Sequence, residues 1–294
     1  MSEKIKISPV IAGTMNWGIW GARFSENDYL QMIQSCVDAG VTTFDHADIY
    51  GHYTVEEEFG KALSLSQNLR SQIQIITKCG INLVTPNRPS NTIKYYDTSK
   101  EHILQSVDNS LRNLGTDYLD VLLLHRPDPL MNPHEVAETF TMLKESGKVL
   151  QFGVSNFNES QTSLICKFFP IKYNQIEISV LKLSGFTNGT LDQCIKEDIT
   201  PLAWSPLGGG KFFDDDDERN KKIIAVADYL AEKYNASVDQ ILLAWLFKHP
   251  SGIVPVLGTV KPIRIQRAMD AIKINLTTEE WYLLWRASTG NELE

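Results

Sequence analysis

The sequence has few cysteines, and this shortage excludes two classes of protein. Only 4 of the 294 residues are cysteine. Cys36, Cys79, Cys166 and Cys194 lie far apart, without a C-x-x-C pair or a histidine at ligand spacing. Neither a zinc site nor a disulfide framework follows from such a pattern, so we predict that the protein binds no metal.

Long apolar runs and an excess of basic residues are also missing. No run approaches the roughly 18 apolar residues that a membrane-spanning helix needs, and residues 1–4 do not introduce an apolar signal segment. The chain carries 28 Lys and Arg against 36 Asp and Glu, a formal charge of -8. Nucleic-acid binding requires clustered Lys and Arg, which the sequence does not show. We expect a cytoplasmic protein that binds neither nucleic acid nor membrane.

Short apolar runs are present instead, and they alternate with segments of helical periodicity. The predicted strands are residues 10–15, 41–44, 73–77, 119–124, 149–154, 171–176, 200–203 and 253–257. The predicted helices are residues 25–40, 54–65, 98–114, 133–145, 159–168, 191–197, two within 211–252, and 262–271. Continuous apolar strands such as 121–124 are typical of a parallel sheet covered on both faces.

Eight such units in about 250 residues predict a (β/α)₈ TIM barrel. The turn at residues 13–18 lacks the G-x-G-x-x-G pattern of a doubly wound dinucleotide-binding sheet. No linker interrupts the alternation, so we predict one α/β domain over residues 1–294. Residues 80–97, which contain two prolines and several asparagines, are predicted to be a structureless loop that contacts substrate.

Polar or glycine residues stand at the ends of the predicted strands, which lie at one mouth of such a barrel. They are Asp45, Lys78, His125, Ser155, Gln175, Trp204 and Gly258. Tyr50 follows Asp45 within the same loop. A lysine ammonium beside a tyrosine favours the phenolate and eases proton donation, and a carboxylate keeps a buried lysine charged. His125 could orient a carbonyl oxygen, and the set Asp45, Tyr50, Lys78 and His125 is therefore suited to protonating an oxyanion as it forms.

Other residues at the same ends suggest a nicotinamide dinucleotide. Side chains of Ser155, Asn156 and Gln175 can hold a carboxamide, and Trp204 offers a flat face to a ring. The glycine run 208–210 with Lys211 allows backbone amides to approach a phosphate. The segment 258–264 offers a second place for a phosphate, at the position where TIM barrels usually bind one.

These residues closely resemble the aldo-keto reductase family over nearly the whole chain, in particular its bacterial YdhF-like branch. The resemblance rests on Gly13 to Gly18, Thr43 to Gly51, Thr77 to Gly80, Leu124 to Pro127, Gly153 to Phe157, Asn174 to Glu177 and Ala203 to Gly208. It implies NADPH as cofactor, Tyr50 as general acid tuned by Lys78 and Asp45, and His125 orienting the carbonyl. The implied cofactor contacts are Gly13, Thr14, Met15, Asp45, Ser155, Asn156, Gln175, Trp204, Ser205, Leu207, Gly208, Lys211, Gly258, Thr259, Lys261 and Arg264.

The partner implied by the resemblance is a small-molecule aldehyde or ketone, with the protein a monomer or weak homo-oligomer. Trp17, Trp20 and His52 are predicted to shape the substrate pocket. Two alternatives remain open at this point. The protein could be a non-catalytic NADPH-binding regulatory subunit, or a Schiff-base aldolase that uses Lys78.

Overall fold

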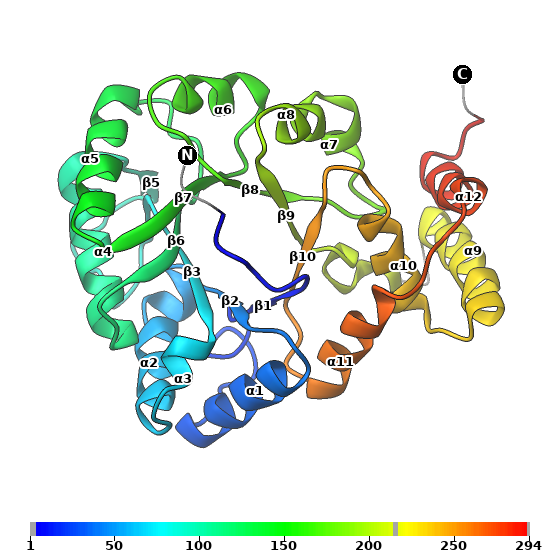
Figure 1. The fold of residues 1–294 in the computed structure, drawn as a ribbon, viewed down its shortest axis with the longest axis horizontal. Coiled ribbons are helices and arrows are strands. Elements are labelled where there is room, and N and C mark those ends of the chain that lie inside the picture. Colours follow the sequence, from blue (N-terminus) through cyan, green and yellow to red (C-terminus); the bar gives the residue numbers. More distant parts are fainter. Residues whose placement is uncertain (1–3, 214–216, 293–294) are drawn as a thin grey trace.

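A closed parallel barrel forms the centre of the molecule. The computed structural model describes residues 4–213 and 217–292, with the backbone alone for 211–213. Within this part of the chain, eight strands close in the order β1-β10-β9-β8-β7-β6-β3-β2 (Figure 1). They are β1 (Ile11–Gly13), β2 (Thr43–Asp45), β3 (Gln74–Cys79), β6 (Leu119–Leu124), β7 (Val149–Ser155), β8 (Tyr173–Glu177), β9 (Thr200–Trp204) and β10 (Val254–Leu257). The predicted (β/α)₈ barrel is confirmed.

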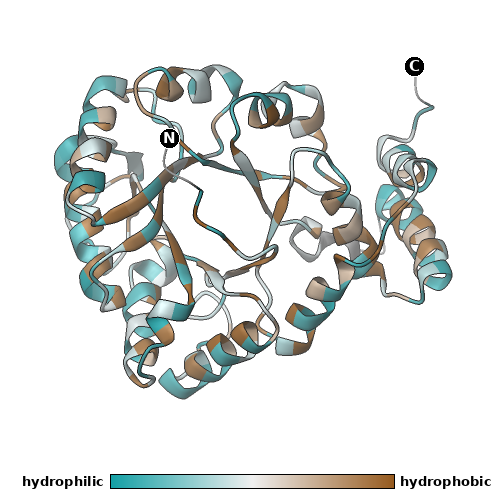
Figure 2. Ribbon diagram, in the orientation of Figure 1, coloured by the Kyte–Doolittle hydropathy of each residue, from teal (hydrophilic) through white to brown (hydrophobic). Residues whose placement is uncertain are grey.

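Helices surround the barrel, and most of them mix hydrophobic with hydrophilic residues while the strands are largely hydrophobic (Figure 2). They are α1 (Glu26–Asp38), α2 (Val55–Ser64), α3 (Leu69–Gln72), α4 (Lys100–Leu114), α5 (Pro133–Glu145), α6 (Glu159–Cys166), α7 (Ser184–Thr187), α8 (Thr190–Lys196), α9 (Glu218–Tyr234), α10 (Val238–Phe247), α11 (Pro262–Ala271) and α12 (Thr278–Thr289), with 3₁₀ segments η1 (Tyr50–His52) and η2 (Gly208–Phe213). Across the described ranges, none of these helices has the length and apolarity needed to cross a bilayer.

The sequence prediction for residues 80–97 is wrong in one respect. This segment contains a small antiparallel hairpin, β4 (Ile81–Asn82) with β5 (Tyr95–Tyr96), in which Ile81 pairs with Tyr96. Strands of two residues are too short to show a periodic pattern in the sequence. These two strands pair only with each other, so no longer sheet predicts them. Helices α3, α7 and α12 were also not predicted. The hairpin makes this segment an ordered wall rather than a free loop.

Two hydrophobic layers hold the strands. The interior layer of the barrel contains Ile11, Ile76, Val121, Leu123, Tyr173, Leu202 and Val256. A larger layer fills the space between strands and helices. Residues 4–8 cross the base of the barrel (Figure 1), where Lys4 pairs with Asp198 at 2.8 Å and the Ser8 amide donates to the Thr43 hydroxyl at 2.8 Å. The base is thus closed, and ligands must enter at the opposite mouth, where the carboxyl ends of the strands lie.

Gly60 gives a test of the packing of α2 on α4. A Cβ atom built at Gly60 would lie 2.1 Å from the Asn113 carbonyl oxygen and 2.8 Å from the Leu114 carbonyl carbon. Backbone atoms cannot rotate away, so we expect Gly60→Ala to destabilise the fold by at least about 2 kcal/mol, although alanine normally favours a helix. Urea unfolding measures this. Ser64→Ala on the exposed side of α2 is the control, and equal stability of both variants would contradict the packing argument.

Candidate active site

A buried lysine links two strands of the barrel at its mouth. Lys78 comes from β3 and is 1% exposed. Its Nζ donates to Asp45 Oδ2 at 2.7 Å and to the backbone oxygen of His46 at 2.7 Å. It also lies 3.1 Å from the Tyr50 hydroxyl oxygen. β2 supplies Asp45 and the following loop supplies Tyr50, so the structure brings these three predicted residues together.

The charges of this group follow from its neighbours. Burial acts to lower the pKa of Lys78, but Asp45 and Tyr50 outweigh it and leave that pKa above its ordinary value. Lys78 is therefore a cation near neutral pH. Burial raises the pKa of Tyr50, and the Lys78 charge opposes this rise. The Lys78 charge acts to lower the pKa of Tyr50, as predicted, but burial raises that pKa by more. The Tyr50 phenol is therefore protonated near neutral pH.

The turn after Tyr50 is locally strained. Gly51, His52 and Tyr53 all have left-handed backbone angles, with φ of 59°, 60° and 72°. Residues other than glycine adopt this conformation at a cost, and it persists where surrounding contacts enforce it. Here Asn87 donates from Nδ2 to the His52 carbonyl oxygen at 2.7 Å. The 80–97 segment therefore fixes the turn that carries the tyrosine.

His125 completes the predicted catalytic set directly after β6. Its ring lies 6.1 Å from that of Tyr50 in a T-shaped arrangement, and its Nδ1 is buried without a hydrogen-bond partner in the described chain. Burial, followed by the charges of Lys78, Arg126 and Lys94, holds the pKa of His125 well below its usual range. The imidazole is therefore neutral, and its buried Nδ1 has no hydrogen-bond partner among the described residues.

Gln175 has a role that the sequence did not suggest. Its side-chain Nε2, from β8, donates to Asp45 Oδ1 at 2.7 Å, so each Asp45 carboxylate oxygen has its own donor. The predicted contact of Gln175 with a carboxamide stays a prediction. Only the closure of the barrel, which brings residues 130 positions apart together, reveals the link to Asp45.

A second chain of hydrogen bonds follows β7 and β9. The Ser155 hydroxyl donates to the Gln175 carbonyl oxygen at 3.0 Å and accepts from Asn156 Nδ2 at 2.8 Å. Asn156 Oδ1 in turn accepts from the Trp204 indole at 2.9 Å. This hydrogen bond orients the partly exposed Trp204 ring at the end of β9, and its predicted stacking role stays a prediction.

The residues predicted to line phosphates lie in two places. Ser205, Leu207 and Gly208 follow β9 and are partly exposed, while Lys211 lies in η2 with its side chain outside the described atoms. After β10, Gly258 and Arg264 are exposed and Thr259 is partly exposed, and Lys261 caps the start of α11. The Asn16 amide donates to the Gly258 carbonyl oxygen at 3.2 Å, which joins the loop after β1 to this segment.

The predicted cofactor contacts of Gly13, at the end of β1, and of Thr14, directly after it, stay predictions. Both residues are buried, and the Thr14 hydroxyl is used internally, with 3.0 Å to the Asp45 carbonyl oxygen and 3.0 Å to His46 Nδ1. Burial, followed by the charge of Lys78, lowers the pKa of His46 to about 3, so this ring is a neutral structural partner. Met15, the third predicted contact in this loop, is 43% exposed.

Trp17, Trp20 and His52 were predicted to shape the substrate pocket, and the prediction for Trp17 is wrong. Its side chain is 0% exposed and packs against Phe24, Tyr29, Phe44 and Phe59. Phe24 precedes α1, Tyr29 lies in α1, Phe44 in β2 and Phe59 in α2, and together they form a cluster around Trp17. Trp20 is in the expected place: its ring lies 6.2 Å from that of Tyr50 and 5.2 Å from that of His52.

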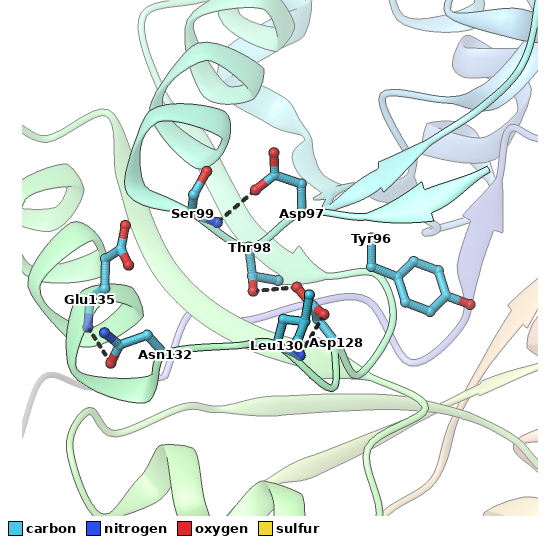
Figure 3. Close-up of a pocket in the computed structure, with 8 residues that line it drawn as sticks. All are labelled: Tyr96, Asp97, Thr98, Ser99, Asp128, Leu130, Asn132 and Glu135. Atoms are coloured by element: carbon cyan, nitrogen blue, oxygen red, sulfur yellow. Dashed lines mark hydrogen bonds between the residues drawn. The ribbon is translucent and has the colours of Figure 1, made fainter. Parts of the chain in front are cut away.

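A cavity of about 280 Å³ lies between the segment 96–99 and the segment 128–135, which follows His125 in the chain. None of the four predicted catalytic residues lines it. Its wall includes Tyr96, Thr98, Asp128 and the start of α5 (Figure 3). Its acidic groups are already engaged. Asp128 accepts from the Thr98 hydroxyl at 2.9 Å and from the Leu130 amide at 2.8 Å. These bonds fix the loop that begins at His125.

Comparison with known proteins identifies relatives over almost the full length. The model of the Aldo/keto reductase family matches residues 9–287. The oxidoreductase YcsN of Bacillus subtilis is 45% identical over 100% of this chain and 98% of its own length. Oxidoreductase YdhF of Escherichia coli is 41% identical over 94% and 93%. A 6-dehydroglucose reductase of Agrobacterium fabrum is 38% identical over 100% and 98%.

Proposed function

Because the chain belongs to the aldo/keto reductase family, we propose that it reduces an aldehyde or ketone to the alcohol with NADPH and that Tyr50 is the general acid. The observation that carries the proposal is the position of Lys78. This fully buried cation lies between the Asp45 carboxylate and the Tyr50 hydroxyl, at 2.7 Å and 3.1 Å. A charge placed there stabilises the phenolate only when Tyr50 has given up its proton.

Each residue then has a defined task. Tyr50 gives its proton to the carbonyl oxygen, which becomes the alcohol, and Lys78 compensates the negative charge left on the phenol. Asp45 keeps Lys78 charged, and Gln175 holds Asp45 in place through its 2.7 Å hydrogen bond. His125 is neutral and can donate a hydrogen bond to the same carbonyl oxygen, which fixes the orientation of the substrate.

The residues present fit a reduced nicotinamide dinucleotide, which would supply the hydride for the carbonyl carbon. Trp204 is partly exposed and is oriented by Asn156 at 2.9 Å, so its ring can face a planar group. The exposed segment from Gly258 to Arg264 opens α11, whose first amides lack helix partners and suit a phosphate. Arg264 is the residue we assign to the 2′-phosphate.

Neither alternative function accounts for the same geometry. A Schiff-base aldolase needs a neutral lysine, whereas Asp45 and Tyr50 raise the pKa of Lys78. A regulatory subunit would not need the hydroxyl of Tyr50 beside that cation. The proposed reductase function gives a role to each of the four residues Asp45, Tyr50, Lys78 and His125.

Two measurements test the proposal in sequence. Tryptophan fluorescence is titrated with NADPH and with NADH, and reduced-nicotinamide absorbance is then followed with a panel of aldehydes. We expect tighter binding of NADPH and consumption of NADPH that depends on the aldehyde. Binding without turnover on any carbonyl would favour the regulatory subunit. Covalent labelling by borohydride with a carbonyl substrate, in the absence of cofactor binding, would favour the aldolase.

The assignment of Arg264 gives a separate prediction. Replacing it by alanine removes an exposed guanidinium that we place on the 2′-phosphate, and charge-assisted hydrogen bonds of this kind correspond to about a 10–100-fold change in affinity. We therefore expect Arg264→Ala to weaken NADPH binding by about that factor and leave NADH binding nearly unchanged. Fluorescence titration gives both values. Lys273→Ala, a surface variant beyond α11, is the control, and an unchanged NADPH to NADH ratio in Arg264→Ala would refute the assignment.

A further inference from the structure

Arg126 is a cation near the catalytic mouth, and it has no ion-pair partner among the described residues. It directly follows His125 and is partly buried. Its guanidinium carbon lies 5.9 Å from the centroid of the Trp204 ring. Arg126 is therefore a sequence neighbour of the proposed orienting histidine and contacts the indole assigned to the cofactor.

Among the residues that the structure describes, no carboxylate forms an ion pair with Arg126. Within residues 4–213 and 217–292, Arg126 has neither a hydrogen bond nor an acidic group within 4.0 Å. Lys94, on the neighbouring hairpin segment, is likewise unpaired there. The charged groups that shift the pKa of His125 are all cations, namely Lys78, Arg126 and Lys94. Of these three cations, Lys78 is paired with Asp45 at 2.7 Å, whereas Arg126 and Lys94 have no ion-pair partner among the described residues.

The acidic side chains nearest in the sequence do not face this charge as partners. Asp128 is held by Thr98 and by the Leu130 amide on the wall of the adjacent cavity (Figure 3). Asp97 accepts from the Ser99 amide at 3.0 Å at the start of α4. Both bonds anchor the loops around Arg126 and leave its guanidinium free. A partly buried guanidinium without a counter-ion among the described residues can accept an incoming anion as its partner.

We propose that Arg126 selects carbonyl substrates that carry a carboxylate, with Lys94 as a weaker second cation. This inference rests on the proposed reductase function and deepens it. A guanidinium binds a carboxylate with two parallel hydrogen bonds. Since Arg126 adjoins His125, such a bond would hold the carboxylate end of the substrate while the carbonyl oxygen meets His125 and Tyr50.

A matched pair of probes isolates the charge. 4-Oxobutanoate and its methyl ester share the aldehyde and the carbon chain, and only the first carries a carboxylate. We expect wild-type kcat/KM to be at least about tenfold higher for the acid, the usual effect of a charge-assisted hydrogen bond. Arg126→Gln is expected to remove this preference, with kcat/KM for the ester within about threefold of wild type. Arg126→Lys keeps the positive charge but loses the paired N–H donors of the guanidinium. It should therefore retain part of the preference for the acid.

Several outcomes would overturn the inference. Equal kcat/KM of wild type for acid and ester would do so, and this is the result expected of an enzyme for neutral sugar aldehydes, the class named for the Agrobacterium relative. An equal fall for both probes in Arg126→Gln, or a raised KM for NADPH, would make Arg126 a structural or cofactor residue.

Failure of the reductase function itself would look different, because wild type would then turn over neither probe. In that case, tryptophan fluorescence measures the binding of each probe to NADPH-loaded protein, and this binding tests the inference about Arg126. Tighter binding of 4-oxobutanoate than of its ester, lost in Arg126→Gln, would support anion selection without reduction. Equal binding of the two probes would end the inference.

Discussion

Tyr50→Phe is expected to lower kcat/KM for carbonyl reduction by about 10²–10⁴-fold, the usual contribution of a general acid. The change removes one oxygen from a ring that is 9% exposed and packs with Ala47, Ile49, Val55 and Ile81, so the packing should survive. What is lost is the proton source 3.1 Å from the Lys78 ammonium. NADPH affinity should remain near the wild-type value, because the residues assigned to the cofactor are elsewhere.

Tyr53→Phe is the matched control for this variant. Tyr53 lies three residues away, and its hydroxyl accepts from the Leu83 amide at 3.0 Å, which ties the turn to the hairpin segment. Its loss should change the rate far less than the loss of the Tyr50 hydroxyl. If Tyr50→Phe kept more than about a tenth of the wild-type rate, Tyr50 would not be the acid. If both variants lost activity equally, a disturbed turn would explain the loss instead.

The prediction of the catalytic group from sequence worked because barrel geometry converts order along the chain into proximity. Asp45 and Lys78 lie 33 positions apart, yet Asp45 is the last residue of β2 and Lys78 the next to last of β3, and the pairing of these strands makes them neighbours. A pattern of polar residues after apolar runs is therefore enough to locate the mouth. It does not specify which hydrogen bonds form there, and the bond from Gln175 to Asp45 went unpredicted for this reason.

Trp17 shows where such reasoning fails. It stands in the loop after β1, close in sequence to Met15 and Trp20, which are exposed, and nothing in its local sequence distinguishes it from them. Its burial is decided by Phe59 and Phe44, which come from other elements. The direction of a side chain in an irregular loop depends on packing, and packing depends on residues that a local pattern does not contain.

Lys78→Met is expected to abolish reduction and also to destabilise the fold. The variant leaves the Asp45 carboxylate, whose side chain is 4% exposed, without its cation and with only Gln175 as donor. Removing one partner of a buried ion pair costs about 3–5 kcal/mol, because the remaining charge is desolvated and uncompensated. Urea unfolding measures the stability, and NADPH-dependent aldehyde reduction measures the activity. Lys61→Met, an exposed lysine paired with Glu57 on α2, is the control and should unfold like wild type.

Adding Asp45→Asn to Lys78→Met separates the two effects. The double variant removes the uncompensated charge, so its stability should return towards that of wild type, since a neutral pair costs much less to bury than a lone charge. Its activity should stay absent, because the ammonium beside Tyr50 is still missing. A double variant that regained activity would show that Lys78 serves only to neutralise Asp45. A Lys78→Met protein as stable as wild type would mean that water or another cation reaches Asp45, and the buried pair would then not explain the electrostatics of the mouth.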